Sequence, residues 1–498
     1  MLQSFIVRAL EAMAAIVVLA VVAAILIGLA IAIYDRIQTH DAVRRNYPLI
    51  GRFRTLFSEL GEFFRQYFFA LDREELPFNR AQRDWIERAS EGKGNTIAFG
   101  STKPLTSPGA TIFAPAAFPA LAEDHNPEAA MVIGPNAKHP FEAQSFFNIS
   151  GMSYGALSKV AVEALSRGAA KAGCWMNTGE GGLSPYHLIG GCDIVFQIGT
   201  AKYGVRDSAG NLSPEKLAEV AARPEVKMFE IKLSQGAKPG KGGILPAQKV
   251  NREIAEIRGI EVGKASISPN RHIEAPDIAG LLGLIDTVKE ATGKPVGIKF
   301  VMGDPTFLDQ LFTAVAARGH GPDFITIDGG DGGTGAAPMP LMDNVGLVVR
   351  EAVPLLDDAL RRHGLRDQIR VIASGKLIEP TDVAFALAAG ADFVVSARGF
   401  MFSLGCIQAL KCNKNSCPTG ITTHDPRFQR GLDPTDKAER VAQYHKGVVE
   451  EVEMIAHSCG ADHARELERA HVRVVRRSGR TEALATLYPP VTGAGVTG

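Results

Sequence analysis

Residues 324–335, FITIDGGDGGTG, join a short apolar run to a loop of glycine, aspartate and threonine. The run has the length of a buried strand, and glycines in the loop let the backbone turn tightly beside a ligand. This arrangement recurs along the chain from about residue 146. Seven further apolar runs occupy residues 146–150, 174–178, 193–198, 228–233, 296–301, 370–374 and 393–397.

Amphipathic segments separate several of these runs, among them SKVAVEALSRGAAKA at 158–172 and TDVAFALAAGA at 381–391. Strands that alternate with helices form parallel βαβ units, and eight such strands predict a closed (β/α)8 barrel. A short ninth run, ASIS at 265–268, is assigned to a loop. The expected fold class is therefore α/β, a (β/α)8 TIM barrel preceded by a single N-terminal transmembrane helix.

The N-terminal part of the chain predicts a membrane anchor. Residues 12–33 contain no charged or strongly polar side chain, and a helix of that length spans roughly 33 Å, about one hydrocarbon thickness. Arg8 precedes the segment, and five arginines follow it: Arg36, Arg44, Arg45, Arg52 and Arg54. The positive-inside rule then predicts a single-pass protein with its large domain in the cytoplasm. A cleaved signal peptide is the alternative.

The rest of the chain divides by composition. We expect a tail at 1–11, the transmembrane helix at 12–33, a juxtamembrane helix and wrapping segment at 34–145, the barrel at 146–425 and a helical extension at 426–498. The aromatic-rich residues 47–69 form a helix packed on the domain or lying at the membrane interface. With 54 basic and 54 acidic residues, the chain has no net field that would attract nucleic acid.

Polar and glycine-rich loops follow the predicted strands, where barrels of this type carry their chemistry. The loops after the last two strands commonly bind phosphate, so Gly375 with Lys376, and Arg398 with Gly399, are expected to hold a phosphate-bearing cofactor. Ser374 belongs to the same loop. Gly330 begins a G-x-G-x-x-G match, but the prolines that follow exclude a dinucleotide-binding helix there.

Five segments then carry a resemblance to a known family: SGMSYGALS, NTGEGG, EIKLSQGAKPGKGG, DGGDGGTGAAP and GCIQALKCNKNSCPTGITT. From about residue 146 to 425 the chain resembles the FMN-binding synthase domain of glutamate synthases. As a whole it resembles the short members called FMN-binding glutamate synthase family proteins. The resemblance implies FMN beside a 3Fe–4S cluster, and reduction of 2-iminoglutarate, formed from 2-oxoglutarate and ammonia, to L-glutamate.

The resemblance also assigns cofactor residues. Met152 and Ser153 would lie against the flavin ring, and Gln197 and Lys299 would reach its polar edge. Gly330 would belong to the same cofactor site. A lysine there would stabilise an anionic reduced flavin, although a salt-bridged barrel lysine is the alternative.

For the substrate, the resemblance points to Glu180, Lys238 and Arg258. A dicarboxylate needs fixed cations, which Lys238 and Arg258 would supply. Glu180 would move protons, since burial can raise the pKa of a carboxyl. The alternative for Glu180 is an N-capping carboxylate on a tight turn.

Cys406, Cys412 and Cys417 are spaced C-x5-C-x4-C. Three thiolates suit an iron–sulfur cluster that lacks one corner iron, and Pro418 mirrors the Cys-Pro ending of ferredoxin motifs. A zinc site completed by His424 and plain reduced thiols are the alternatives.

The chain also departs from the large enzymes of the family. No cysteine precedes Cys174, so we do not expect it to release ammonia from glutamine. Lys241 and Ile244 replace a glutamate and a glutamine of the large enzymes, which leaves a related keto acid as an alternative substrate. A non-catalytic electron-transfer subunit is the second alternative. With no nicotinamide-binding domain in the sequence, the electron donor is expected to be external, either ferredoxin or a reductase subunit.

Overall fold

The computed structural model describes residues 2–121, 130–489 and 491. Its contacts divide the chain into two compact units, Met1–Ala81 and Gln82–Gly498. The two units are described separately below.

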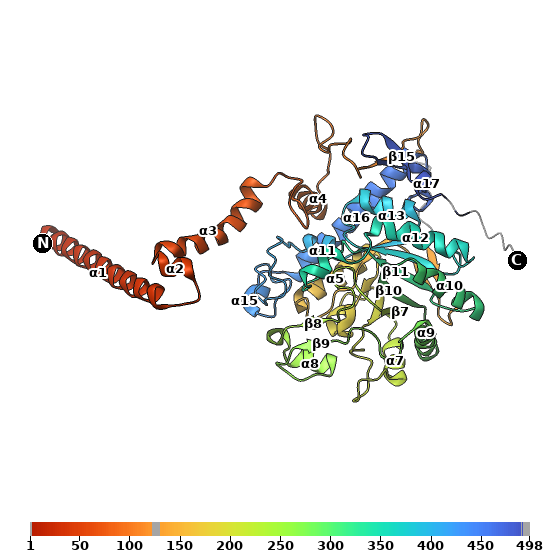
Figure 1. Ribbon diagram of the computed structural model, residues 1–498, viewed down its shortest axis with the longest axis horizontal. Helices are drawn as coiled ribbons and strands as arrows, with labels where there is room; N and C mark the ends of the chain where they lie inside the picture. Colours follow the sequence, from red (N-terminus) through yellow and green to blue (C-terminus); the bar gives the residue numbers. More distant parts are fainter. Residues whose placement is uncertain (1, 122–129, 490, 492–498) are drawn as a thin grey trace. The chain divides into compact units, whose positions relative to one another are not determined.

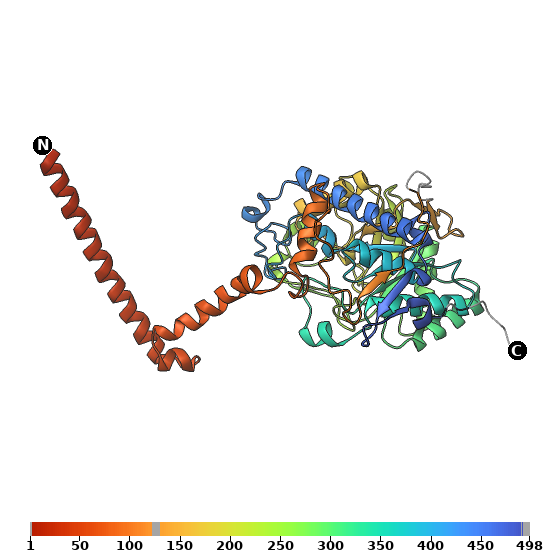
Figure 2. The ribbon, with the colours of Figure 1, turned by 90° about the horizontal axis from the view of Figure 1, so that it is seen from above.

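The first unit is helical. Helix α1 (Leu2–Ile37) is long and apolar enough to cross a membrane, with a mean hydropathy of 3.3 and no buried residue in its most apolar window. A turn and the short helix α2 (Ala42–Asn46) lead to α3 (Ile50–Phe64), which continues as a π-helical turn, Arg65–Phe69. Figure 2 shows α1 and α3 meeting at this turn.

An ion pair holds the turn between the two helices. Asp35, near the end of α1, is fully buried, and the guanidinium of Arg52 in α3 donates to both of its carboxylate oxygens, the shortest contact being 2.6 Å. The amide of Leu49 donates to the same carboxylate at 3.1 Å. Asp41 caps α2 by accepting from the amides of Val43 and Arg44, as expected for an N-cap aspartate.

The second unit contains a closed barrel of eight parallel strands (Figure 1). In barrel order they are β4 (Phe147–Ile149), β5 (Met176–Asn177), β6 (Ile194–Ile198), β7 (Val226–Lys232), β10 (Val296–Val301), β11 (Phe324–Asp328), β12 (Arg370–Ser374) and β13 (Phe393–Ser396). The pairing of β13 with β4 closes the ring. Each of the eight predicted runs overlaps one of these strands, and β7 begins two residues before its run, at Val226, so the barrel prediction is confirmed.

Helices follow the strands and cover the outside of the barrel. They are α5 (Lys159–Ala172), α6 (Pro185–Leu188), α7 (Pro214–Ala221), α9 (Ile278–Thr292), α10 (Thr306–Arg318), α12 (Val349–Arg362), α13 (Pro380–Ala389) and α14 (Arg398–Ser403). Because helices cover one face of the sheet and side chains fill the interior, nearly all strand residues are buried. This explains why the strands appear in the sequence as continuous apolar runs.

A long C-terminal helix, α16 (Pro434–Cys459), packs against α5 and α13. Its approach to α5 requires a glycine: a Cβ on Gly168 would lie 2.4 Å from Cγ1 of Val441. The remaining helices of this unit are α4 (Arg80–Ser90), α8 (Arg252–Arg258), α11 (Met339–Asn344), α15 (Pro426–Gln429) and α17 (Leu484–Leu487).

Three small sheets complete the unit. The hairpin β2 (Met131–Ile133) and β3 (Phe141–Ala143) contributes Ile133 and Phe141 to a buried cluster with Trp175 and Phe393. A second sheet joins β1 (Thr111–Phe113), β14 (Val472–Val475) and β15 (Thr481–Ala483). The third pairs β8 (Ile244–Leu245) with β9 (Ser266–Ile267) outside the barrel. The run at 265–268 therefore contains a strand, and its assignment to a loop was wrong.

Candidate functional site

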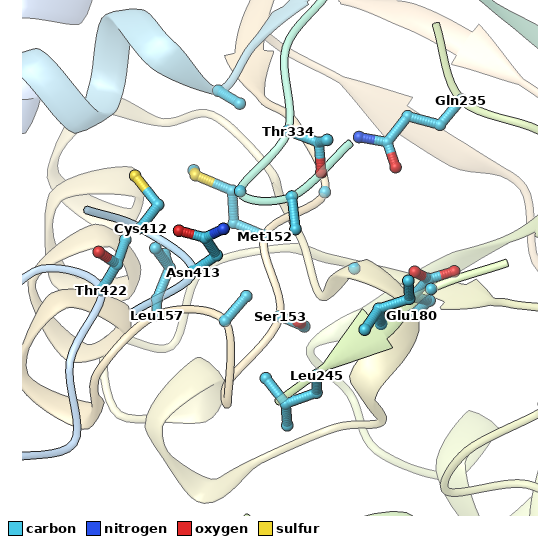
Figure 3. Close-up of a pocket in the computed structure, with 18 of the residues that line it drawn as sticks. Met152, Ser153, Leu157, Glu180, Gln235, Leu245, Thr334, Cys412, Asn413 and Thr422 are labelled. Carbon is cyan, nitrogen blue, oxygen red and sulfur yellow. The ribbon is translucent and has the colours of Figure 1, made fainter. Parts of the chain in front are cut away.

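A cleft opens where the barrel strands end, with about 1030 Å3 of space when the part open to solvent is included. Loops after β4, β5, β7, β11 and β13 form its walls together with β8, α8 and the loop that carries the cysteines. In the view of Figure 3, Glu180 lies at one side of the cleft and Cys412 with Thr422 at the other. The predicted site residues that line it are Met152, Ser153, Glu180, Gln197, Lys238, Arg258, Arg398 and Cys412.

The charges around the cleft are unequal. Five cationic side chains and one carboxylate line it: Lys232, Lys238, Lys249, Arg258, Arg398 and Glu180. Buried charges are stable only when they are paired or hydrogen-bonded. The cleft therefore suits an anionic ligand.

Glu180 sits on a tight turn after β5, Gly179–Gly181, and its Oε2 lies 3.2 Å from Nζ of Lys232 at the end of β7. Gly199 and Gly243 enclose it, since a Cβ on either would lie within 2.6 Å of the Glu180 side chain. Burial by itself would raise the pKa of Glu180, but the charges of Lys232, Lys238 and Arg258 bring the pKa below its ordinary value. The expectation of a raised pKa was wrong, and Glu180 is an ionised acceptor.

Arg258, the last residue of α8, is buried against the cleft. Its Nη1 donates to Oγ of Ser266 at 3.4 Å, and its Nη2 donates to the carbonyl oxygen of Tyr154 at 3.3 Å. Its guanidinium also lies over the ring of Tyr203, 5.2 Å from the centroid. Its Nε has no hydrogen-bond partner among the described residues, and burial lowers its pKa. An arginine held in this way is preorganised to receive a carboxylate.

Two lysines add to the positive charge of the cleft. Nζ of Lys238 makes a long contact of 3.5 Å with the carbonyl oxygen of Gly242, and burial lowers its pKa. Lys249 is almost fully buried, donates to the carbonyl oxygen of Ala156 at 3.0 Å, and has its pKa lowered by burial to about 8.

Several predicted cofactor residues lie outside the cleft wall: Lys299, Gly330, Ser374, Gly375, Lys376 and Gly399. Lys299 faces a small cavity inside the barrel, and its Nζ lies 3.8 Å from Oδ2 of Asp328. Ser374 donates to the other oxygen of the same carboxylate at 2.7 Å. Lys299 therefore forms an ion pair inside the barrel, as the alternative prediction for this residue describes.

Protein packing accounts for the glycines of this group. A Cβ on Gly330 would lie 2.4 Å from the carbonyl oxygen of Gly346, and a Cβ on Gly399 would lie 2.0 Å from Oη of Tyr444. Gly375 has a φ of +125°, which favours glycine. Its neighbour Lys376 also adopts a positive φ, of +57°.

The three cysteines share one loop, but their side chains are not gathered into a metal site. Within the described parts of the chain, no group of three or more His, Cys, Asp or Glu side chains is placed to hold a metal ion. Cys412 Sγ accepts from Nη1 of Arg398 at 3.8 Å, and Cys417 Sγ lies 3.3 Å from Oγ1 of Thr419. His424 has its Nε2 2.9 Å from the carbonyl oxygen of Gly155.

The electrostatics of these thiols differ. Burial raises the pKa of Cys406, and the charges of Cys412 and Cys417 add to this effect, while Arg398 opposes it. Burial would also raise the pKa of Cys417, but hydrogen bonds from Thr419 and Thr422 lower it below its usual value. Cys406 is thus influenced by the charges of the other two thiols, and Cys412 lies beside a guanidinium, which favours a thiolate.

Comparison with known proteins shows the family to which this chain belongs. Residues 108–462 match the family described as the conserved region in glutamate synthase. The chain is 39% identical over 486 residues to the glutamate synthase large subunit-like protein YerD of Bacillus subtilis (strain 168), covering 90% of this chain and 92% of that protein. The chain belongs to the glutamate synthase family. Membership makes it an oxidoreductase of the glutamate synthase type.

Other relatives share only part of their length with it. The archaeal-type glutamate synthase [NADPH] of Thermotoga maritima is 36% identical over 335 residues, which cover 67% of this chain and 62% of that protein. Among solved structures, a mutant of the active chimera of (S)-mandelate dehydrogenase aligns with a TM-score of 0.48 and 13% identity, over 78% of this chain and 98% of that one.

Two charged residues that line the cleft, Lys232 and Lys249, were not among the residues predicted from the sequence. Lys232 had a usable signal, because a charged residue at the C-terminal end of a barrel strand usually serves the site. Lys249 had none, since its burial depends on the loop of the cysteines packing over it.

Lys232→Met removes the cation that pairs with Glu180. Because burial raises the pKa of this carboxyl and Lys232 lowers it, the pKa should rise in the variant. The acidic limb of a pH–rate profile reports groups that must be ionised. We therefore expect that limb to move to higher pH in the variant. Lys227→Met is the matched control: Lys227 lies in the same strand but pairs with Asp193. Identical acidic limbs in wild type and the Lys232 variant would contradict the electrostatic account of Glu180.

Proposed function

We propose that the chain binds FMN non-covalently in the cleft and reduces 2-iminoglutarate, formed from 2-oxoglutarate and ammonia, to L-glutamate. The observation that carries the proposal is the pairing of a buried, incompletely satisfied arginine with an ionised glutamate: Arg258 has a free Nε, and Glu180 is held as a carboxylate. The names of the family relatives, glutamate synthases, supply the chemistry that this pair would serve.

FMN fits the lining of the cleft. Met152 and Ser153 offer a loop after β4, Gln197 offers an amide and Arg398 a cation, all on the cleft wall. Cβ atoms built on Gly333 and Gly335 would make ordinary van der Waals contacts, with Arg398 at 3.5 Å and Cys412 at 3.8 Å. When bound, FMN supplies a hydride to an imine carbon. We retain Lys299, Gly330, Ser374, Gly375, Lys376 and Gly399 as proposed binding residues, because they belong to the loops and strands directly behind this wall.

The protein side of the reaction follows from the charges. Arg258 and Lys238 would bind the carboxylates of the keto acid, with Arg258 able to use two N–H groups on one carboxylate. Glu180, as an ionised carboxylate, would accept a proton from the attacking nitrogen during formation of the imine. Lys238, whose pKa burial lowers, would be the proton donor on the same face.

A second candidate, reduction of another small keto acid, is favoured by one residue. Ile244 in β8 lines the cleft, and an apolar side chain cannot donate to a substrate oxygen. A pure electron-transfer subunit is disfavoured, because a relay has no use for the unsatisfied Arg258.

We further propose that Cys406, Cys412 and Cys417 bind a 3Fe–4S cluster. The donor set supports it: three thiols in mutual electrostatic range, beside Arg398, with no carboxylate among them. Cys412 itself lines the cleft, so a group held by these thiols would adjoin the flavin site. When bound, the cluster supplies single-electron transfer from an external donor, either ferredoxin or a reductase subunit.

Helix α1 would anchor the protein in a membrane. Its length and hydropathy support a span, and the arginines that follow it support a cytoplasmic catalytic domain. The proposed domain limits are those given by composition, with the span at 12–33 inside the longer helix α1.

Arg258→Met should raise the KM for 2-oxoglutarate by about 30-fold or more, since truncating one partner of a buried charge pair costs at least ~2 kcal/mol. Glutamate formation would be followed with reduced ferredoxin and ammonium. Arg252→Met is the control, on the same helix but exposed and paired with Glu256. An unchanged KM in the Arg258 variant would remove the basis of the proposed substrate.

Cys412→Ser should abolish the paramagnetic signal of the cluster and entry of electrons from ferredoxin, while FMN stays bound. Electron paramagnetic resonance, iron and labile-sulfide analysis and the flavin absorbance of anaerobically purified protein measure these properties. Cys459→Ser is the control, a buried thiol in α16 away from the loop. Zinc without iron or sulfide in the wild-type protein would refute the cluster.

A further inference from the structure

Beneath the cleft, inside the barrel, a buried carboxylate connects four strands. Glu230 in β7 is 3% exposed. Its Oε1 accepts from Oγ1 of Thr326 in β11 at 2.6 Å. Its Oε2 accepts from Nδ2 of Asn177 in β5 at 2.9 Å and from Nε2 of Gln197 in β6 at 2.5 Å. Glu230 lines the small cavity that Lys299 also faces, and it is not on the cleft wall.

The chemistry of Glu230 fixes the direction of both amides. Oε2 of Glu230 accepts from both amides, whereas an amide offers NH2 on one side and a carbonyl oxygen on the other. Asn177 and Gln197 must therefore turn their NH2 groups toward Glu230 and their carbonyl oxygens away from it. The orientation of an amide follows from its hydrogen-bond partners. Here one carboxylate determines the orientation of two amides, those of Asn177 and Gln197.

The two carbonyl oxygens have different partners. Oδ1 of Asn177 accepts from the amide of Gly179 at 2.9 Å, which holds the turn that carries Glu180. Gln197 lines the cleft, and within the described residues its Oε1 has no donor from the protein. The carbonyl of Gln197 is therefore left as an acceptor for a ligand.

Close packing restricts the amides from above. A Cβ on Gly151 would lie 2.9 Å from Oδ1 of Asn177 and 3.1 Å from Nε2 of Gln197. The backbone of the loop after β4 thus rests on both side chains. With Glu230 on one side and Gly151 on the other, Gln197 has little freedom to exchange its two polar atoms.

We propose that Glu230 is a positioning residue, which fixes Gln197 as a hydrogen-bond acceptor toward an N–H group on the polar edge of the flavin ring. The inference rests on the proposed function, because FMN is the ligand that the cleft would hold. A reversed amide would present NH2 to the ring N–H, leaving two donors face to face. A buried donor left without an acceptor weakens binding, because the cost of removing it from water is not offset.

The test is the affinity of the full-length apoprotein for FMN, measured in detergent by the quenching of flavin fluorescence. Glu230→Met fills a similar volume but has no strong acceptor, so Gln197 loses its enforced direction. We expect the dissociation constant to rise by about tenfold and the reduction potential of bound FMN to shift. Thr326→Val, which removes a different partner of Glu230, should leave the affinity near that of the wild type. An equal loss in the Thr326 variant would show that any disturbance of the interior weakens FMN, and would overturn the proposal.

A double-mutant cycle separates positioning from a merely structural role. If Glu230 acts through Gln197, the double variant Glu230→Met/Gln197→Met should bind FMN no more weakly than Gln197→Met alone. Additive losses would overturn the proposal. If Glu230→Met fails to fold, Glu230→Asp repeats the cycle, because it keeps the charge but withdraws the carboxylate from Gln197.

The cycle also distinguishes this inference from the proposed function. Wild-type apoprotein that binds no FMN would refute the proposed function and this inference with it. Tight binding by wild type and equally tight binding by Glu230→Met would refute the inference alone.

Discussion

The surplus of positive charge at the end of the barrel is the constraint on which the site depends. Five cationic side chains surround one carboxylate, and the ion pair of Glu180 with Lys232 neutralises only one of them. Charges in such a place lose hydration that the protein does not fully replace. Burial lowers the pKa of Arg258, Lys238 and Lys249, because the charged form of each loses hydration. An anionic ligand would offset this loss.

Two carboxylates inside the barrel organise the groups beneath the cleft. Glu230 collects donors from three other strands. Asp328 accepts from Ser374 and from the amide of Gly236, and lies beside Lys299. These contacts cross between strands that are far apart in the sequence, so the barrel must close before either network exists. The closed barrel, and not the local sequence, therefore fixes the positions of the side chains around Glu230 and Asp328.

The sequence was sufficient for the barrel and for half of the site. Strand positions could be predicted because helices cover the sheet and leave uninterrupted apolar runs. Met152, Glu180 and Arg398 could be placed at the cleft because they follow strands. Packing between distant segments also decides how other predicted residues lie: a Cβ on Gly399 would meet Tyr444 of α16, and Lys299 lies beside Asp328 inside the barrel. The sign of the pKa change at Glu180 depends on cations from a strand, a loop and a helix, Lys232, Lys238 and Arg258, which no local pattern reveals.

The central claim is that this cleft aminates 2-oxoglutarate with free ammonia. It is tested most directly by supplying the FMN-loaded, anaerobically purified protein with reduced ferredoxin, 2-oxoglutarate and 15N-ammonium, and analysing the products by mass spectrometry. We predict 15N-labelled L-glutamate that requires all three additions. Absence of labelled glutamate, or labelling of a different amino acid when other keto acids are offered in its place, would contradict the claim.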